Sequence, residues 1–406
     1  MTLSLHDPLT FTHGAPHDEF RRLRDHDPVS RHEHPVIGTY YAVARYDDVL
    51  HVSRDSHTFS NAPHPMPDLG AGIDEHGEPD ADGGVSELLI SKDPPEHTKL
   101  RKLINRGFTP RRVSDLTDRI QTRVDGIIDS LRDRNSCDLV ADLSLWLPLH
   151  VIADLVGVPE SDRAHIFELT ETTFGFDASV TPEQRGAAAM EMYAYADTMV
   201  RERVDAPRDD LMSVLTQAEI DGEKLTDFQL ALFFMLLQNA GSETTRNLIT
   251  TGTLVLLERP DQLARLRAQP TLLPTAIEEL LRFVTPVMTF LRRAIVDTEV
   301  GDQAVAAGER VMMLYASANR DERKFERPDT VDVGRNPNEH VAFGAGGPHY
   351  CLGASLARLE ARIMFETILT RFEGLAIDGD PATFPRVHSN LIDGYAAAPI
   401  TWTSIS

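Results

Sequence analysis

One long apolar helix with a polar centre limits most strongly what this chain can fold into. Thr226 and Gln229 have the spacing of a capping box, and an apolar helical pattern then continues to Glu258, just before Pro260. At about 1.5 Å per residue this helix is about 50 Å long, so it has to cross the core of the protein. The chain has 406 residues, of which 41% are hydrophobic, and can therefore surround such a helix.

The middle of this helix reads NAGSETTRN, between two apolar runs. Gly241 and Ser242 have low helix propensity, and burial of the Glu243 carboxylate is unfavourable. A Gly-Ser pair followed by hydroxyl residues is a place where a helix can bend or open its hydrogen bonds around a water. Glu243 and Thr244 would then hold an acid and an alcohol beside a small cavity, ready to relay protons. The alternative is a polar turn that faces solvent.

A cysteine lies where a glycine-rich turn leads into a second amphipathic helix. Gly344, Gly346 and Gly347 with Pro348 in FGAGGPHYCLG predict a tight turn, and an apolar helical stripe begins just after Cys351. A helix N-terminus favours an anion, so we expect this thiol to ionise more readily than its reference pKa of about 8.5 implies. The thiolate could be a nucleophile or a haem ligand, whereas His349 alone makes a poor zinc set. A structural cysteine in a turn is the remaining alternative.

A third helix, from Asp93 onward, is predicted to carry a cationic face. Asp93 is expected to cap it, with Pro94 at the first helical position and Glu96 completing a capping box. His97 and Arg101 then lie four residues apart on one face. Two such donors suit an anionic ligand, for example a carboxylate or a phosphate.

The same region is a local positive island. No acidic residue occurs between His97 and Ser114, although the chain has 63 acidic residues against 40 lysines and arginines and a net charge of −23. That overall charge argues against general binding of nucleic acids or of anionic membrane surfaces. The island from Lys99 to Arg112 is either a solvated face or a docking patch for an acidic partner.

The rest of the chain predicts a mainly α fold with a minor β part. Helical patterns dominate from Ser91 to Thr285, and the short alternating runs that follow, divided at Gly301-Asp302, predict small hairpins. Earlier, TYYAVARY predicts a strand, and DDVLHVSR predicts a helix behind an Asp cap. Because we find no repeat and no linker between two cores, we expect one domain over residues 1–406.

The segment from Asn61 to Gly84 is dense in Pro, Gly, Asp and His, which predicts a long mobile loop, either a lid or a disordered segment. Two cysteines in a chain of this length make no disulfide framework, so we expect a reducing, cytoplasmic location. We expect neither a signal peptide nor a membrane anchor, because the N-terminus lacks the pattern and the long apolar helix is polar at its centre.

Together these motifs resemble a cytochrome P450 over nearly the whole chain. The segments AGSETT, EELLR, ANRD, FERP and GPHYCLG occur in the order typical of that family. The resemblance implies the P450 fold, a triangular prism with a long central helix over haem b. It implies a haem-thiolate monooxygenase that inserts one oxygen atom from O₂ into a largely apolar small molecule. The chain is also similar to an actinobacterial group that oxidises sterols and branched lipids and carries one extra residue between Phe343 and Cys351.

The resemblance further implies roles for single residues. Cys351 would be the axial thiolate of the haem iron, which favours O–O cleavage, and Phe343 would pack near it. Four donors would hold the haem propionates, namely His97, Arg101, Arg292 and His349. The full set expected to contact the haem is His97, Arg101, Ala240, Gly241, Arg292, Phe343, His349, Cys351 and Gly353.

Proton delivery, structural support and the substrate pocket follow from the same resemblance. Glu243 and Thr244 would deliver protons to dioxygen, with Gly241 leaving room for it. A buried network of Glu279, Arg282 and Arg335 would support the cysteine side, whereas the first two residues alone would predict an ordinary surface pair. The residues expected to line the pocket are Leu236, Asn239, Ala240, Met288, Phe290 and Leu391. A terpenoid, a steroid, a fatty acyl chain or a macrolide would fit such a pocket.

Electrons would come from NAD(P)H through a ferredoxin reductase and a ferredoxin, for which the positive island is the candidate surface. We expect a monomer. A peroxide-driven peroxygenase of the same fold is one alternative, disfavoured because a peroxide pathway does not need the acid and alcohol. A cysteine-dependent hydrolase without haem is another, and it would be colourless.

Overall fold

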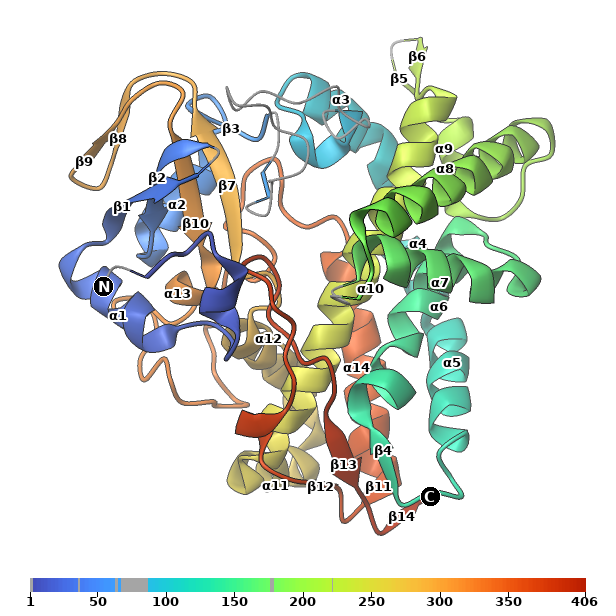
Figure 1. The fold of residues 1–406 in the computed structure, drawn as a ribbon. Helices are drawn as coiled ribbons and strands as arrows, with labels where there is room; N and C mark the ends of the chain where they lie inside the picture. The colour runs from blue at the N-terminus through green and yellow to red at the C-terminus, as the bar shows by residue number, and fades with distance from the viewer. Residues whose placement is uncertain (1–2, 36, 63–64, 67–86, 176–178, 221) are drawn as a thin grey trace.

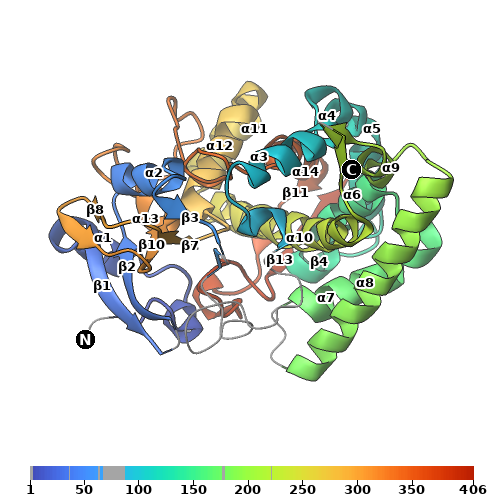
Figure 2. The same ribbon diagram turned by 90° about the horizontal axis from the view of Figure 1, so that it is seen from above.

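A long helix, α10 (Asp227–Leu257), organises the molecule. Figure 1 shows it running through the middle, with the main sheet on one side and α5 to α8 on the other, and the view from above in Figure 2 repeats this division. The structure is a computed structural model, and it describes residues 3–35, 37–62, 65–66, 87–175, 179–220 and 222–406.

The sequence predicts the bounds of α10 correctly. Thr226 and Gln229 form the expected capping box, each side chain accepting from the other residue's backbone N–H at 3.1 Å. The helix is continuous through its polar centre, so the predicted bend or opening is not seen. The hydroxyl of Ser242 donates to the Gln238 carbonyl, and that of Thr244 donates to the Ala240 carbonyl at 3.0 Å. These side chains bond one turn back within an intact helix.

Other helices surround α10 with apolar side chains. Those that pack directly on it include α6 (Trp146–Val156), α7 (Arg163–Phe174), α8 (Pro182–Asp205), α9 (Leu211–Thr216), α11 (Pro260–Ala268), α12 (Leu273–Val284) and α14 (Ala354–Arg371). The remaining helices are α1 (His17–His26), α2 (Tyr46–Arg54), α3 (Glu96–Ile104), α4 (Pro110–Asp115), α5 (Thr117–Asp129) and α13 (Tyr315–Ala318). One apolar core joins α5, α6, α8 and α10 and includes Val124, Leu147, Val200 and Phe234.

The main sheet joins distant parts of the chain. Its described strands run in the order β1 (Val29–His34), β2 (Gly38–Val43), β10 (Arg310–Leu314), β7 (Thr289–Ala294) and β3 (Phe59–Ser60). Only the pairing of β2 with β10 is parallel among these strands, with Tyr41 opposite Val311. The predicted strand near residue 40 is therefore confirmed, and besides β1 it pairs with β10, some 270 residues away.

Short pairs of strands complete the β part. The hairpin predicted at Gly301-Asp302 forms between β8 (Thr298–Val300) and β9 (Gln303–Val305). A small sheet joins β12 (Ala376–Ile377), β13 (Pro399–Thr401) and β4 (Ser136–Asp138). Two further pairs are β5 (Glu219–Ile220) with β6 (Glu223–Lys224) and β11 (Phe372–Glu373) with β14 (Ser404–Ile405).

Two predicted helix caps are wrong. Helix α2 begins at Tyr46, before the aspartates, and has no side-chain cap. Helix α3 begins at Glu96, also without one, because the Asp93 carboxylate accepts instead from the Ser60 hydroxyl and from the Asn61 backbone N–H. Sequence spacing could not reveal this competing partner.

Two further predictions concern the loop and the membrane. Of the loop predicted from residue 61 to 84, residues 63–64 and 67–84 lie outside the described residues. Within the described part of this segment, the Leu291 N–H donates to the Pro65 carbonyl at 2.6 Å.

One described helical stretch, Leu139–Val156, is apolar enough to cross a membrane by composition, but 61% of it is buried within the protein, as in a core helix.

Candidate active site

One face of α10 keeps accessible surface although the helix lies in the core. Leu236, Ala240 and Thr244 share this face, each four residues from the next, and Ala240 is exposed. Ser242 and Glu243, on the other sides of the helix, are buried. An accessible stripe on a core helix marks the side on which a ligand can lie.

Two histidines from distant segments meet at the cysteine loop, which comprises residues 343–351. The ring centroids of His97, in α3, and His349 are 4.1 Å apart. Both ring nitrogens of His97 and Nε2 of His349 are buried and have no hydrogen-bond partner among the residues that the structure describes. Buried polar groups in folded proteins normally have partners, so these nitrogens indicate a ligand that accepts hydrogen bonds.

Two arginines add positive charge to this pair. Burial, followed by the charges of Arg292, His97 and Arg101, lowers the pKa of His349 to about 2. Burial and Arg101 lower the pKa of His97 to about 4. Arg292 itself is buried, and one of its N–H groups donates to the Leu291 carbonyl at 2.7 Å. Neutral imidazoles beside two guanidinium groups form a site for an anion such as a carboxylate.

Cys351 lies three residues before α14, as the sequence predicts. The residue as a whole keeps accessible surface, yet its thiol is surrounded by enough protein that burial raises its pKa. The backbone N–H groups of Gly353 and Ala354 and the charges of Arg101 and Arg358 act in the opposite direction but are outweighed. The predicted lowering of this pKa is therefore wrong for the protein alone, because desolvation exceeds the effect of the helix terminus.

Phe343 stays beside the cysteine despite the extra residue between them. Its carbonyl accepts from the Cys351 N–H at 2.9 Å. Its ring lies 6.4 Å from that of Tyr350, and the Arg358 guanidinium carbon lies 4.4 Å from its centroid. The turn between Phe343 and Cys351 is closed by main-chain bonding, so the two residues stay adjacent although eight positions separate them.

Glu243 is buried and forms an ion pair with Arg246, one turn further along α10. A second N–H group of Arg246 lies 3.5 Å from the carboxylate of Glu171 in α7. Burial raises the pKa of Glu243 to about 7, while Arg246 lowers it and Glu171 raises it. An acid with such a pKa can bind and release a proton near neutral pH.

Sequence reasoning missed Arg246. The signal that could have found it is the three-residue spacing between Glu243 and Arg246, which places the two charges on one helix face. The contact with Glu171 depends on the fold, since α7 and α10 are far apart in sequence.

The structure also shows the surroundings of several predicted haem-contact and pocket residues. A side chain on Gly241 would collide with Ile152 of α6, so this glycine allows the two helices to approach closely. Asn239, Phe290 and Leu391 are partly accessible, as a pocket requires. Met288 is only 1% exposed and packs in an apolar cluster with side chains of the N-terminal segment, so its burial does not support a place in the pocket.

The structural network around Glu279 is present. Arg282 donates to both carboxylate oxygens of Glu279 at 2.8 Å, and Arg335 donates at 3.0 to 3.1 Å. The Asn338 side chain and the Asp332 N–H also donate to this carboxylate, each at 3.0 Å. Both Glu279 and Arg282 have no exposed surface, so the pair is a buried structural element.

Comparisons with known proteins decide the family. The family model described as cytochrome P450 matches residues 180–387, just over half of the chain. A steroid C26-monooxygenase of Rhodococcus jostii is 37% identical over 406 residues, covering 98% of this chain and 84% of the relative. The chain belongs to the cytochrome P450 family.

Two further comparisons extend this cytochrome P450 assignment. A methyl-branched lipid omega-hydroxylase of Mycobacterium tuberculosis is 37% identical over 371 residues, covering 90% of this chain and 84% of the relative. The solved structure of Mycobacterium marinum cytochrome P450 CYP268A2 in complex with pseudoionone has a TM-score of 0.88, with 35% identity over 99% of this chain and 98% of that one. The predicted P450 fold is confirmed.

As a cytochrome P450, the protein is a haem-containing monooxygenase that inserts one oxygen atom from O₂ into a largely apolar small molecule. This assignment replaces the cysteine hydrolase alternative. The residues present fit haem b, because unpartnered imidazole nitrogens and two guanidinium groups match its two carboxylates. The accessible, mostly apolar face of α10 matches a flat macrocycle.

Proposed function

We propose that this cytochrome P450 holds the haem iron through Cys351 and the haem carboxylates through four donors, His97, Arg101, Arg292 and His349. The observation that carries the proposal is the set of buried ring nitrogens without partners beside two arginines and the cysteine loop. Haem, when bound, supplies the iron at which dioxygen is activated. The test is replacement of Cys351 by alanine, which should abolish the thiolate spectrum of the reduced carbon monoxide complex.

Glu243 and Thr244 are proposed to supply protons. Glu243 lies buried on the side of Arg246, whereas Thr244 keeps accessible surface on the ligand side. A carboxyl group with a pKa near 7 can be reprotonated from the direction of Glu171 and can pass a proton towards the Thr244 hydroxyl. This arrangement favours use of dioxygen over a peroxide pathway. Faster turnover with peroxide than with a ferredoxin system would reverse that assignment.

The substrate is proposed to be a branched apolar molecule, either a steroid side chain or a methyl-branched lipid. Two relatives named for such reactions support this class. The accessible residues Leu236, Ala240, Phe290 and Leu391 are apolar, and Asn239 can bond a hydroxyl or carbonyl of the substrate or hold a water. A spectral titration of the holoenzyme with steroids, branched lipids, terpenoids and macrolides tests this, because bound substrate displaces water from the iron. A response confined to macrolides would contradict it.

An acidic ferredoxin, reduced by NAD(P)H through a reductase, is proposed to dock on the positive island. Lys102 and Arg111 are exposed, Arg112 is half-exposed, and in the part of the chain that the structure describes none of them has an ion-pair partner within 4 Å. Helix α4, which carries the last two, packs on α14, the helix that follows the cysteine loop. The patch thus lies near the proposed haem ligand. We further propose a cytoplasmic monomer.

Charge reversal tests this docking surface. Lys102→Glu with Arg111→Glu should slow electron transfer at low salt by about tenfold or more, because opposite charges accelerate encounter. Haem content and peroxide-driven turnover should not change. Arg201→Glu, on the exposed face of α8, is the control for charge reversal outside the island. Equal electron-transfer rates in the double variant and the control would contradict the proposal.

A further inference from the structure

The middle of the cysteine loop, which carries one residue more than is usual in the family, lies in contact with α2. Phe343 and Cys351 are eight positions apart. Between them, the Ser53 hydroxyl of α2 donates to the Gly346 carbonyl at 3.1 Å. The next residue of α2, Arg54, donates from Nε to the carbonyl of Ala345 at 3.2 Å. The C-terminal end of α2 therefore binds the middle of the loop.

The contact is close enough to require glycine. Gly347 has a φ of +80°, and a side chain at this position would collide with the backbone carbonyl oxygen of Ser53. Gly346 has a φ of +89°, and a Cβ there would lie 3.0 Å from Arg54 Nε. Ala345 is buried in the apolar cluster that includes residues of α2. The loop main chain thus lies directly on the helix.

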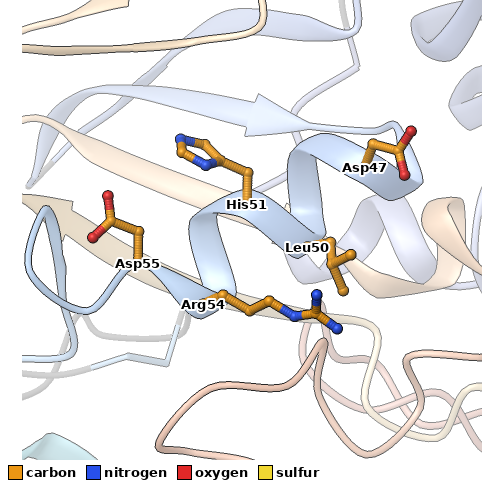
Figure 3. Close-up of a pocket in the computed structure, with 5 residues that line it drawn as sticks. All are labelled: Asp47, Leu50, His51, Arg54 and Asp55. Carbon is orange, nitrogen blue, oxygen red and sulfur yellow. The ribbon is translucent and has the colours of Figure 1, made fainter.

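Arg54 is free to hydrogen-bond the loop because no described carboxylate pairs with it. It lies on an open surface pocket of about 520 Å³, whose lining residues are Asp47, Leu50, His51, Arg54 and Asp55. Figure 3 shows its side chain extending beside Leu50, away from His51 and Asp55. Among the described residues no carboxylate lies within 4 Å of its guanidinium group. The hydrogen bond to the loop therefore has no competing ion pair there.

We propose that Ser53 and Arg54 are positioning residues for the haem ligand, holding the longer loop on α2 so that Cys351 keeps one orientation. The proposal rests on the assignment of Cys351 as the ligand. The loop is closed at its other end by the bond from the Cys351 N–H to the Phe343 carbonyl. Attachment in the middle and closure at the ends together limit where the sulfur can lie.

The test uses the holoenzyme and the spectrum of its reduced carbon monoxide complex, which distinguishes thiolate from non-thiolate ligation. Arg54→Met keeps the length of the side chain but removes the donor, and Arg54→Lys restores one. We expect Arg54→Met to shift the ratio of the two forms about fivefold towards non-thiolate under mild heating, as loss of one hydrogen bond implies. Ser53→Ala should shift the ratio in the same direction, and Arg54→Lys should recover part of the loss.

Arg45→Met is the matched control. Arg45, at the other end of α2, also donates from Nε to a main-chain carbonyl, that of Arg24, at 2.9 Å. Loss of this hydrogen bond in Arg45→Met should lower the melting temperature without changing the ratio of thiolate to non-thiolate forms. An unchanged ratio in Arg54→Met and Ser53→Ala, or an equal change in Arg45→Met, would overturn the proposal. A thiolate spectrum in Cys351→Ala would instead show that the ligand assignment itself has failed.

Discussion

At the scale of single residues, the protonation of Glu243 depends on two neighbours with opposite effects. Arg246 pairs with it within the same helix, and Glu171 approaches Arg246 from α7. Burial dominates and raises the pKa of Glu243 from 4.5 to about 7. The carboxyl group therefore titrates in the range in which enzymes commonly work.

This pKa predicts a pH dependence of stability. Because the folded pKa lies above the unfolded value, the contribution of Glu243 to folding is complete below about pH 4.5 and is lost as the pH rises to about 7. Glu243→Gln removes this dependence. As the pH rises over that interval, the free energy of unfolding of the variant should therefore increase relative to that of the wild type, by on the order of 3 kcal/mol. Urea unfolding at a series of pH values measures the difference. Parallel curves for the two proteins would contradict the prediction.

The two neighbours should shift this titration in opposite directions. Arg246→Met removes the positive charge and should raise the pKa of Glu243, whereas Glu171→Gln removes a negative charge and should lower it. The measurement is the pH dependence of product formed per NAD(P)H consumed. Shifts of the same sign in both variants would show that Glu243 does not control the profile.

At the scale of elements, close contacts between main chains decide where the cysteine loop lies. Gly344 and Gly347 have similar backbone conformations, with φ of +91° and +80°, but different surroundings. A Cβ on Gly344 would meet its nearest atoms at 3.9 Å, an ordinary contact, whereas one on Gly347 would collide with α2. Substitutions at these two glycines therefore separate the effect of backbone conformation from that of the contact between the loop and α2.

We predict that Gly347→Ala destabilises the holoenzyme more than Gly344→Ala does. Both carry a cost of about 1 kcal/mol for the left-handed backbone conformation. Only Gly347→Ala must also displace the loop from α2, which should cost about 1 to 3 kcal/mol more, as other forced overlaps do. Thermal unfolding followed at the Soret band compares the variants. Equal melting temperatures would argue against a tight contact with α2.

At the scale of the whole molecule, a buried charge cluster joins α12 to the segment before the cysteine loop. Glu279 accepts hydrogen bonds from Arg282 in its own helix and from Arg335 and Asn338 much later in the chain. The main sheet likewise pairs strands of the first 60 residues with β7 and β10, which lie between residues 289 and 314. That residues 1–406 form a single domain stays a prediction, and one cooperative unfolding transition would support it.

Glu279→Gln should destabilise the protein by about 3 to 5 kcal/mol, because it leaves buried arginines without a counter-charge. Asp18→Asn is the control, since Asp18 and Arg21 have the same three-residue spacing but lie exposed on α1. We expect no measurable change from the control. Denaturant unfolding of both variants gives the comparison, and similar stabilities would contradict a structural role for the network.

The sequence alone determined what depends on neighbours within about four residues. Helical period and capping residues placed α10 and α14, and spacing identified His97 with Arg101 and Glu279 with Arg282 as pairs. The tertiary structure decided what depends on distant contacts. These are the hydrogen bond from the Ser60 hydroxyl to the Asp93 carboxylate, the burial of Met288, and the raised pKa of Cys351. It also placed the middle of the cysteine loop on α2. Local patterns specify helices, but desolvation and long-range partners exist only after the chain has folded.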